Sequence, residues 1–329
     1  MTIYDQIPKD IQKMHDLGFK GEGYTFVAFE ANADYPHDIW VRDILQAHVP
    51  LAKGHIEKTT FDTKTGMINC LKHNPDVINM SFEGGNPDYW RNYLSLDGVS
   101  HTALFDSFFN STFIVAASCN KGDNKDRFPA ATEYYKDQCL SAGSAIWDGR
   151  HWLKDGYVTY NNKLDVLTKG DYIINGEVIK GTSFSAPGAS GRAVLYMEQL
   201  DKLGWTRTIA TVRNCLIGKT IDIYDNGYDI KSGYGILEMG VCMVHTVEFT
   251  VGEAKYFVDG EKRINKGLQT IEGNLVEVEV PVTVIDGRTQ LSIDVTKKLC
   301  NEFAPVIEVD TVWNVNNPNK VIFKYLSVK

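Results

Sequence analysis

A run of small residues at positions 181–191 constrains the fold of this chain more than any other feature of its sequence. It reads Gly-Thr-Ser-Phe-Ser-Ala-Pro-Gly-Ala-Ser-Gly and is followed by an apolar-periodic segment that extends to about residue 200. A helix whose first turns carry so little bulk can be buried end-on against another backbone. Pro187 fits the first turn of such a helix, where its missing N–H is not needed. The run therefore predicts a buried helix that begins close to Ser183.

Ser183, at the start of this helix, is open to two interpretations. A lone serine before a helix is most often an N-cap, whose side chain satisfies a free backbone amide. The amides and the dipole of a helix N-terminus also favour developing negative charge, so a serine there can act as a nucleophile if a base lies within hydrogen-bond reach. The choice depends on which polar residues precede the motif.

Strands and helices alternate along residues 10–217. Residues 24–29 and 112–117 are near-continuous apolar runs of the kind found in buried parallel strands. Further strands are predicted at residues 55–61, 76–81, 139–145 and 164–168, and helices at residues 10–17, 39–47, 67–73 and 205–217. This order predicts an α/β domain with a mostly parallel sheet and helices on both faces.

Two polar residues stand at the carboxyl ends of predicted strands, which is where open α/β sheets place their ligand sites. Glu30 follows the strand at residues 24–29, and Asn120 follows the strand at residues 112–117. Each also has a simpler interpretation, Glu30 as a solvated strand end and Asn120 as part of an Asn-x-Gly turn. Their positions favour a role in a site at that edge of the sheet.

His37 stands just before the predicted helix at residues 39–47, and six residues separate it from Glu30. A histidine placed there can serve as a general base, or it can be an ordinary surface residue. His48 lies at the end of the same helix and His55 at the start of the next strand, so both fit the role less well. Asp34 competes with Glu30 as the acid that would orient the imidazole.

Taken in chain order, these segments resemble the subtilisin-like serine proteases (subtilases). The run Gly-Thr-Ser-x-x-x-Pro-Gly at residues 181–188 is similar to the subtilase serine motif. Residues 118–120 read Ser-Cys-Asn where subtilases usually have Ala-Gly-Asn, and residues 128–130 match the Tyr-Pro-Ala that commonly follows. Residues 76–85 resemble the strand and glycine run that form one wall of the subtilase substrate cleft. The resemblance covers about residues 10–245.

The resemblance implies roles for four residues and calls for no metal or cofactor. Ser183 would be the nucleophile and His37 the general base, while Glu30 would hold the imidazole and Asn120 would donate to the oxyanion. Two positions depart from the family, because subtilases carry Asp in place of Glu30, and their His-Gly-Thr-His-Val-Ala-Gly signature keeps here only His37 and Val41. The substrate is expected as an added strand against Phe61, Asp62, Thr63, Ser81, Phe82, Glu83 and Gly84.

The implied activity is that of a serine endopeptidase that cleaves a protein or peptide through an acyl-enzyme. The short connection between Glu30 and His37 and a stalk-like tail suggest a phage- or prophage-encoded processing protease. A second interpretation follows from the two departures: a catalytically inactive subtilase homologue that binds a peptide or a protein. An unrelated esterase is a poorer third choice, because its nucleophile motif would be Gly-x-Ser-x-Gly, which the Ser183 segment lacks.

The chain changes character near residue 246, which predicts two domains, a peptidase domain at residues 1–245 and a small β-rich appendage at residues 246–329. Short alternating strands are predicted at residues 248–251, 255–258, 276–284, 289–293 and 321–326. The appendage weakly resembles the stalk module named for the N-terminal region of copper amine oxidases. No His cluster accompanies it, so copper is not expected, and its predicted role is structural or docking to a partner.

Composition excludes several other classes of protein. The net charge of −8 argues against nucleic-acid binding, and a run of about 18 apolar residues, as a membrane span needs, is missing from the sequence. The six cysteines are scattered without a C-x-x-C pair, which favours reduced thiols over disulfides or zinc. The first residues lack the basic and apolar regions of a signal peptide, so a cytoplasmic or phage-associated protein is expected.

Overall fold

A computed structural model describes most of the chain as two compact units, Met1–Met239 and Gly240–Lys329. The described residues are 2–31, 36–59, 63–83, 111–127, 129–130, 139–264, 266–271, 274–279, 283–285, 288–290, 298–299, 301–304, 306–313 and 320–329. Among them, no helix is both long enough and apolar enough to cross a membrane.

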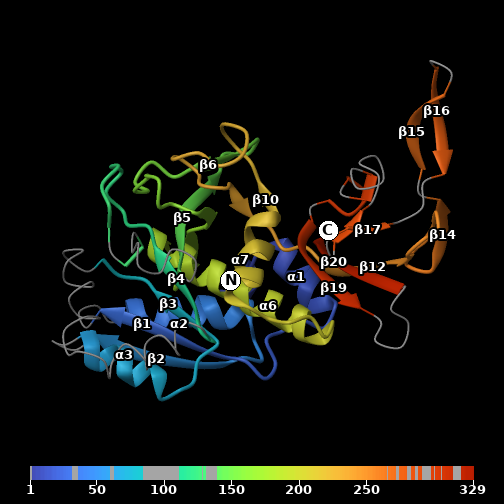
Figure 1. Cartoon of the computed structure of the whole chain (residues 1–329). Helices are drawn as coiled ribbons and strands as arrows, with labels where there is room; N and C mark the ends of the chain where they lie inside the picture. Colours follow the sequence, from blue (N-terminus) through green and yellow to red (C-terminus); the bar gives the residue numbers. More distant parts are fainter. Residues whose placement is uncertain are drawn as a thin grey trace. The chain divides into compact units, whose positions relative to one another are not determined.

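The first unit is built on a mostly parallel sheet, shown in Figure 1. Its strands are β1 (Thr25–Ala31), β2 (Lys53–Thr59), β3 (Val77–Met80), β4 (Phe113–Ala117), β5 (Cys139–Trp147), β6 (Trp152–Lys154), β7 (Val166–Lys169), β10 (Thr220–Ile221) and β11 (Ile236–Leu237). They follow the order β10-β11-β7-β5-β4-β3-β1-β2, with β6 beside β5. Antiparallel pairing occurs at β10–β11 and β5–β6, and the other pairs are parallel. This confirms the predicted fold class.

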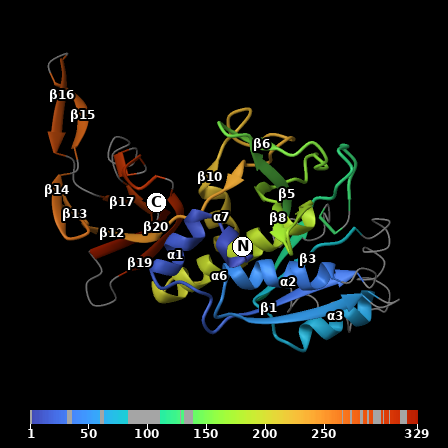
Figure 2. The ribbon, with the colours of Figure 1, turned by 180° about the vertical axis from the view of Figure 1, so that it is seen from behind.

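Helices cover both faces of this sheet. They are α1 (Lys9–Asp16), α2 (His37–His48), α3 (Thr63–Leu71), α6 (Thr182–Lys202) and α7 (Ile209–Gly218), preceded by a 3₁₀ turn at Tyr4–Gln6. Successive side chains of β1 point to opposite faces, so Val27 packs in one core with Cys70 of α3. Ala28 packs in another core with Val41 of α2 and Phe184 of α6. Figure 2 shows α2 and α3 on opposite sides of β1.

Helix α6 runs through the middle of the first unit and packs against α2, β3, β4, β5 and β7. Its small residues allow this burial: a Cβ on Gly191 would lie 2.4 Å from the Cβ of His48. The prediction for Pro187 is wrong, because the helix begins at Thr182 and the proline lies in its second turn. Proline has no N–H to donate, so the carbonyl of Ser183, four residues earlier, lacks its usual helical partner.

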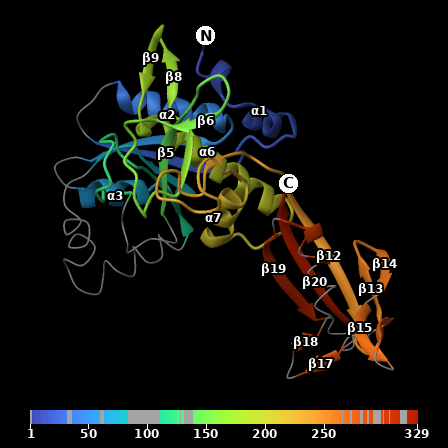
Figure 3. The same ribbon diagram turned by 90° about the horizontal axis from the view of Figure 1, so that it is seen from above.

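The sequence indicates one short β-like run at residues 172–179, but these residues form a hairpin. Strands β8 (Asp171–Ile174) and β9 (Glu177–Lys180) pair antiparallel, as Figure 3 shows. Their turn places Asn175 at φ 54° and Gly176 at φ 84°, and Asn-Gly is the sequence that favours such two-residue turns. The hairpin leads directly into Ser183.

The second unit is an antiparallel sheet of order β14-β13-β12-β20-β19, with two further hairpins. The strands are β12 (Cys242–Thr250), β13 (Lys255–Val258), β14 (Glu261–Ile264), β15 (Lys266–Ile271), β16 (Asn274–Glu279), β17 (Thr283–Ile285), β18 (Arg288–Gln290), β19 (Val306–Trp313) and β20 (Lys320–Val328). The predicted strand at residues 276–284 is divided between β16 and β17, and β19 had no sequence prediction. The core consists of Val247, Phe249, Tyr256, Val258, Leu299 and Phe303.

Candidate active site

A cleft of about 320 Å³ opens at the carboxyl edge of the parallel sheet. Its walls come from the ends of β1 and β4, the residues after β3, and the first residues of α2 and α6. The lining residues are Glu30, Ala31, His37, Ser81, Phe82, Glu83, Ala117, Cys119, Asn120, Lys121, Thr182 and Ser183. All four residues with predicted catalytic roles therefore line the same cleft, although 153 positions separate Glu30 from Ser183 (183 − 30).

Glu30 and His37 form a pair on one wall of the cleft. The Oε2 atom of Glu30 lies 3.2 Å from the Nδ1 atom of His37, and the glutamate is only 1% exposed. Burial raises the pKa of Glu30 above its ordinary value, and the hydrogen bond with His37 offsets part of that rise. When Glu30 is ionised, Nδ1 carries the ring proton and donates it to the carboxylate, which leaves Nε2 as a proton acceptor.

The ring of His37 is also held from the side of α6. Its centroid lies 5.4 Å from that of Phe184, the residue after Ser183, and Trp40 approaches the same phenyl ring. Because Phe184 belongs to the first turn of α6 and is 5% exposed, its ring fixes the imidazole relative to the serine helix.

Ser183 and Ser81 are joined by two hydrogen bonds. The hydroxyl of Ser183 donates to the Ser81 carbonyl at 3.1 Å, and the hydroxyl of Ser81 donates to the Ser183 carbonyl at 2.7 Å. The second bond satisfies the carbonyl that Pro187 leaves without a helical donor. The motif proline therefore ties the start of α6 to the segment after β3.

A series of buried hydrogen bonds supports the contact between Ser81 and Ser183, and it was not predicted from the sequence. The side-chain amide of Asn79 donates to the Ser81 hydroxyl at 2.8 Å, and the Ser190 hydroxyl donates to Asn79 Oδ1 at 3.1 Å. Asn79 is fully buried within β3. An asparagine in an otherwise apolar strand was a usable signal, because buried polar groups need partners.

Asn120 is oriented by the first residue of α6. The Thr182 backbone amide donates to Asn120 Oδ1 at 2.9 Å, which commits the oxygen and leaves the NH₂ group of the side chain as a donor. That nitrogen would lie 3.4 Å from a Cβ placed on Gly181. The side chain thus presents a donor next to Ser183, at the helix N-terminus whose dipole favours negative charge.

Comparison with known proteins identifies the family of this chain. A model of the Subtilase family matches residues 27–235. The chain belongs to the subtilase family of serine peptidases. No curated protein gives a significant match.

Several solved structures share the fold of this subtilase at low sequence identity. The prenylagaramide maturation protease PagA is 16% identical, with a TM-score of 0.55 over 70% of this chain and 96% of its own. A lanthipeptide protease is 13% identical, with a TM-score of 0.56 over 70% of this chain and 90% of its own. The PatG macrocyclase in complex with peptide is 13% identical, with a TM-score of 0.51 over 71% of this chain and 94% of its own.

Cys119 stands where subtilases usually have glycine, and it keeps the backbone conformation that glycine favours. Its φ is +83°, and a side chain in the left-handed region costs about 1–2 kcal/mol. Its thiol is not a competing nucleophile, because burial raises its pKa to about 12 and leaves little thiolate at neutral pH.

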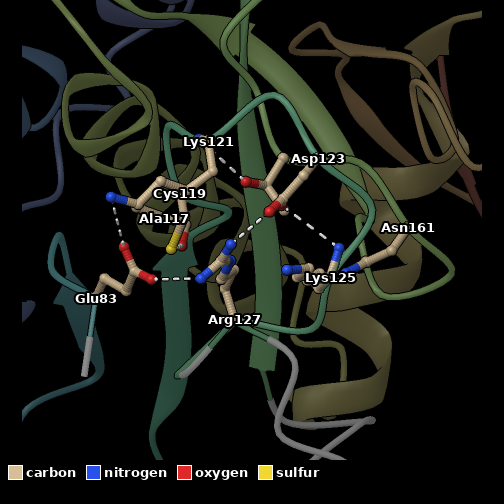
Figure 4. Close-up of polar contacts among 9 residues, drawn as sticks. Glu83, Ala117, Cys119, Lys121, Asp123, Lys125, Arg127 and Asn161 are labelled. Atoms are coloured by element: carbon tan, nitrogen blue, oxygen red, sulfur yellow. Dashed lines mark hydrogen bonds and ion pairs between the residues drawn. The ribbon is translucent and has the colours of Figure 1, made fainter. Parts of the chain in front are cut away.

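A charged cluster fixes the part of the cleft wall that Glu83 and Lys121 form (Figure 4). Arg127 binds Glu83 at 3.0 Å and also binds Asp123, while the Lys121 ammonium lies 3.8 Å from Glu83. The cluster joins the segment after β3 to the loop after β4. Glu83, a predicted substrate-binding residue, is thus held by ion pairs within the subtilase itself.

The predicted substrate-binding residues have different outcomes. Ser81, Phe82 and Glu83 line the cleft, and the Phe82 ring packs edge-on against Phe29. Phe61, Asp62 and Gly84 lie outside the described residues, as does the competing acid Asp34. Thr63 is the first residue of α3, and its side chain is also outside the described part.

The competing histidines lie elsewhere in the subtilase domain. His48 is fully buried, with Nδ1 2.8 Å from the Ile44 carbonyl oxygen, and burial lowers its pKa to about 3, aided by the positive charge of Arg192. His55 stacks on His73 with their ring centroids 3.9 Å apart. Neither His48 nor His55 is among the residues that line the cleft.

Asn120 offers a quantitative test of the oxyanion site. Asn120→Ala removes the side-chain donor and should lower kcat for a peptide substrate by about 10²–10³ with KM nearly unchanged, as loss of the equivalent donor does in subtilisin itself. Steady-state kinetics measure both constants. Asn161→Ala is a matched control, because the side-chain bonds of Asn161 go to Lys125, Asp126 and Lys163, which are not among the residues that line the cleft. A loss below about threefold in Asn120→Ala would remove this residue from the oxyanion site.

Proposed function

We propose that this subtilase is a serine endopeptidase that cleaves peptide bonds through an acyl-enzyme intermediate. One observation carries the proposal: Ser183, the Glu30–His37 pair and Asn120 come from separate elements and line one cleft. A nucleophile, an oriented base and a donor for the oxyanion are the groups that acyl transfer needs.

In the proposed first half-reaction, Ser183 Oγ attacks the scissile carbonyl carbon while His37 Nε2 accepts the hydroxyl proton. The carbonyl oxygen becomes an oxyanion, which receives hydrogen bonds from the Asn120 side chain and the Ser183 backbone amide. When the C–N bond breaks, His37 returns the proton to the leaving amine. Water then repeats the sequence on the acyl-enzyme, with His37 as base, and releases the acid product and free Ser183.

Glu30 has two tasks in this scheme. Its bond to His37 Nδ1 fixes the tautomer in which Nε2 is free to accept a proton. Its negative charge also stabilises the imidazolium that forms during attack. Because the carboxylate is buried, this interaction is stronger than it would be in water.

The proposed substrate is an extended polypeptide bound along the segment at Ser81, Phe82 and Glu83. Two proteins that share the fold are, by name, a prenylagaramide maturation protease and a lanthipeptide protease. This likeness fits the narrower proposal that the chain processes a precursor peptide. A phage or prophage origin stays a prediction from sequence, and the β-rich unit at residues 240–329 is proposed as a stalk or docking module without a catalytic residue.

One observation favours the alternative of an inactive, peptide-binding homologue. The Ser183 hydroxyl donates to the Ser81 carbonyl, so catalysis requires it to turn from that bond toward His37. Catalytic hydrogen bonds are often loose in free enzymes and tighten only with substrate bound. A chemical probe that reacts only with an activated serine separates the two functions.

A fluorophosphonate should label Ser183, because attack on phosphorus needs the same base and oxyanion donors as attack on a carbonyl. Mass spectrometry of the digested, labelled chain identifies the modified residue. Ser183→Ala should abolish labelling, whereas Ser185→Ala, two residues along the same helix, should still be labelled. Labelling that persists in Ser183→Ala would place the nucleophile elsewhere. A parent chain that stays unlabelled would favour the inactive homologue.

A further inference from the structure

We propose that Lys58 and Asp38 form a positioning pair that sets the proton affinity of the Glu30–His37 dyad. The proposal rests on the proposed function, because it assigns the pair a role in the same acid–base chemistry. Lys58 and Asp38 are absent from the residues that the subtilase resemblance singles out, and the sequence reading gave neither a role.

The sheet places Lys58 beside the catalytic acid. In the parallel pairing of β1 and β2, Lys58 is the direct partner of Glu30. Side chains of paired residues in neighbouring strands point to the same face, and the face of Glu30 is the one covered by α2, because Ala28 packs there with Val41. Lys58 is thus directed at the helix that carries His37.

Asp38 receives the Lys58 ammonium. Its Oδ2 atom lies 2.9 Å from Lys58 Nζ, and its side chain is only 8% exposed. Although burial alone would raise the pKa of Asp38, the hydrogen bond from Lys58 and nearby backbone amides hold it below its ordinary value. Asp38 is therefore a buried carboxylate that stays ionised next in sequence to the proposed base.

A buried negative charge beside the dyad would favour the protonated dyad. Asp38 already adds to the rise that burial causes in the pKa of Glu30. The Lys58 ammonium, 2.9 Å from Asp38 Oδ2, carries the opposite charge and offsets part of this effect at the dyad. Without that compensation, the dyad would hold its proton to higher pH, and His37 would be unable to act as a base there.

Other charged groups near the dyad are compensated within their own clusters. On α2, Arg42 binds Asp43 at 2.6 Å one turn beyond Asp38. On β2, the alternation of side chains directs Glu57 to the other face, where it binds His73 at 2.7 Å. In the lining of the cleft, Glu83 is bound by Arg127 and approached by Lys121. The described residues of β3 carry no charge. The Lys58–Asp38 pair is therefore placed to set the electrostatic potential at the Glu30–His37 dyad.

The test is the pH dependence of kcat/KM for peptide hydrolysis, or of the fluorophosphonate labelling rate. Lys58→Met leaves Asp38 uncompensated and should move the acid limb of the profile to higher pH by about 0.5–1 unit. Asp38→Asn leaves the ammonium uncompensated and should move the limb to lower pH by a similar amount, since a nearby charge shifts the pKa of a titrating group by about a unit. The double variant should return the limb close to its parent position.

Two further variants complete the design. Lys58→Arg keeps the positive charge, so its acid limb should lie at the same pH as that of the parent. Lys53→Met makes the same charge change at the other end of β2, where Lys53 is exposed and pairs with Thr25, and should leave the limb unchanged. Circular dichroism verifies that each variant is folded, and Asp38→Asn tests the direction of the shift even if Lys58→Met does not fold.

The outcomes separate this proposal from the proposed function. Shifts of opposite sign in the two single variants support the positioning pair. The proposal is overturned if the acid limbs of both single variants coincide with that of the parent, or if both limbs move in the same direction. A fall in overall activity alone does not support it, because damage to packing would not depend on the sign of the charge that was removed. A parent chain with neither hydrolysis nor labelling at any pH overturns the proposed function itself.

Discussion

His37→Ala should lower kcat for peptide hydrolysis by about 10⁶, the size of the loss that follows removal of the base in subtilisin. Without the imidazole, nothing accepts the Ser183 proton during attack or returns one to the leaving amine. The structure supports this choice of base, because Nδ1 of His37 lies 3.2 Å from the buried Glu30 and its ring contacts Phe184. A loss of this size can be measured with discontinuous assays, in which a high concentration of the variant is incubated with the peptide before the product is quantified.

His151→Ala is a matched control for this variant, because the His151 side chain is 71% exposed and its ring pairs with Asp148, three residues before it in the chain. It should retain the parent kcat. The informative contrary result is a His37→Ala protein with near-parent activity. That result would transfer the base role to another histidine and would show that the chain between β1 and α2 had been matched to the wrong subtilase segment.

The mutual positions of the candidate catalytic residues were predictable because parallel strands end at one edge of a sheet. Apolar runs located β1 and β4, which run parallel in one sheet with β3 between them, so Glu30 and Asn120 had to lie at the same edge of that sheet. The small residues of the serine motif likewise predicted a buried helix, and α6 is that helix. These inferences depend on local pattern and need no knowledge of side-chain contacts.

The supporting contacts could not be predicted, because they join residues distant in the sequence through a specific register. Lys58 becomes the neighbour of Glu30 only in the observed alignment of β1 with β2, and a shift of one residue would turn it to the other face. The hydrogen bond between Ser190 and Asn79 spans 111 positions. The hairpin at β8 and β9 was missed for a different reason: the Asn-Gly turn signal was read as part of a continuous strand.

Glu30→Gln should lower kcat by about 10⁴, the cost of replacing the orienting acid of a serine-protease triad by its amide. The amide can offer its NH₂ group to the ring, which favours the tautomer with the proton on Nε2, where the serine proton must go. Asp34→Asn is the matched control, since Asp34 was the competing acid, and this variant should lower kcat only slightly. If Asp34→Asn is the crippling variant and Glu30→Gln the mild one, the orienting role belongs to Asp34.

The same Glu30→Gln change should make the fold more stable at neutral pH. Burial raises the pKa of Glu30 above its ordinary value of 4.5, so the folded state binds this proton more tightly than the unfolded chain does. Its contribution to stability is therefore greatest below about pH 4.5 and is lost as the pH rises through the raised pKa. Above the raised pKa the carboxylate is ionised in both states, and the full cost of burying that charge opposes folding.

Glutamine removes this cost because it is neutral at every pH. Urea unfolding at pH 7 should give Glu30→Gln a larger free energy of unfolding than the parent, and the difference should shrink as the pH is lowered toward 4. Asp155→Asn, an acid outside the cleft, should show no such pH-dependent gain. A Glu30→Gln protein that is less stable than the parent at pH 7 would mean that the bond to His37 outweighs the cost of burial. An enzyme that is inactivated and stabilised by one substitution would instead show that Glu30 is kept ionised for catalysis at the expense of the fold.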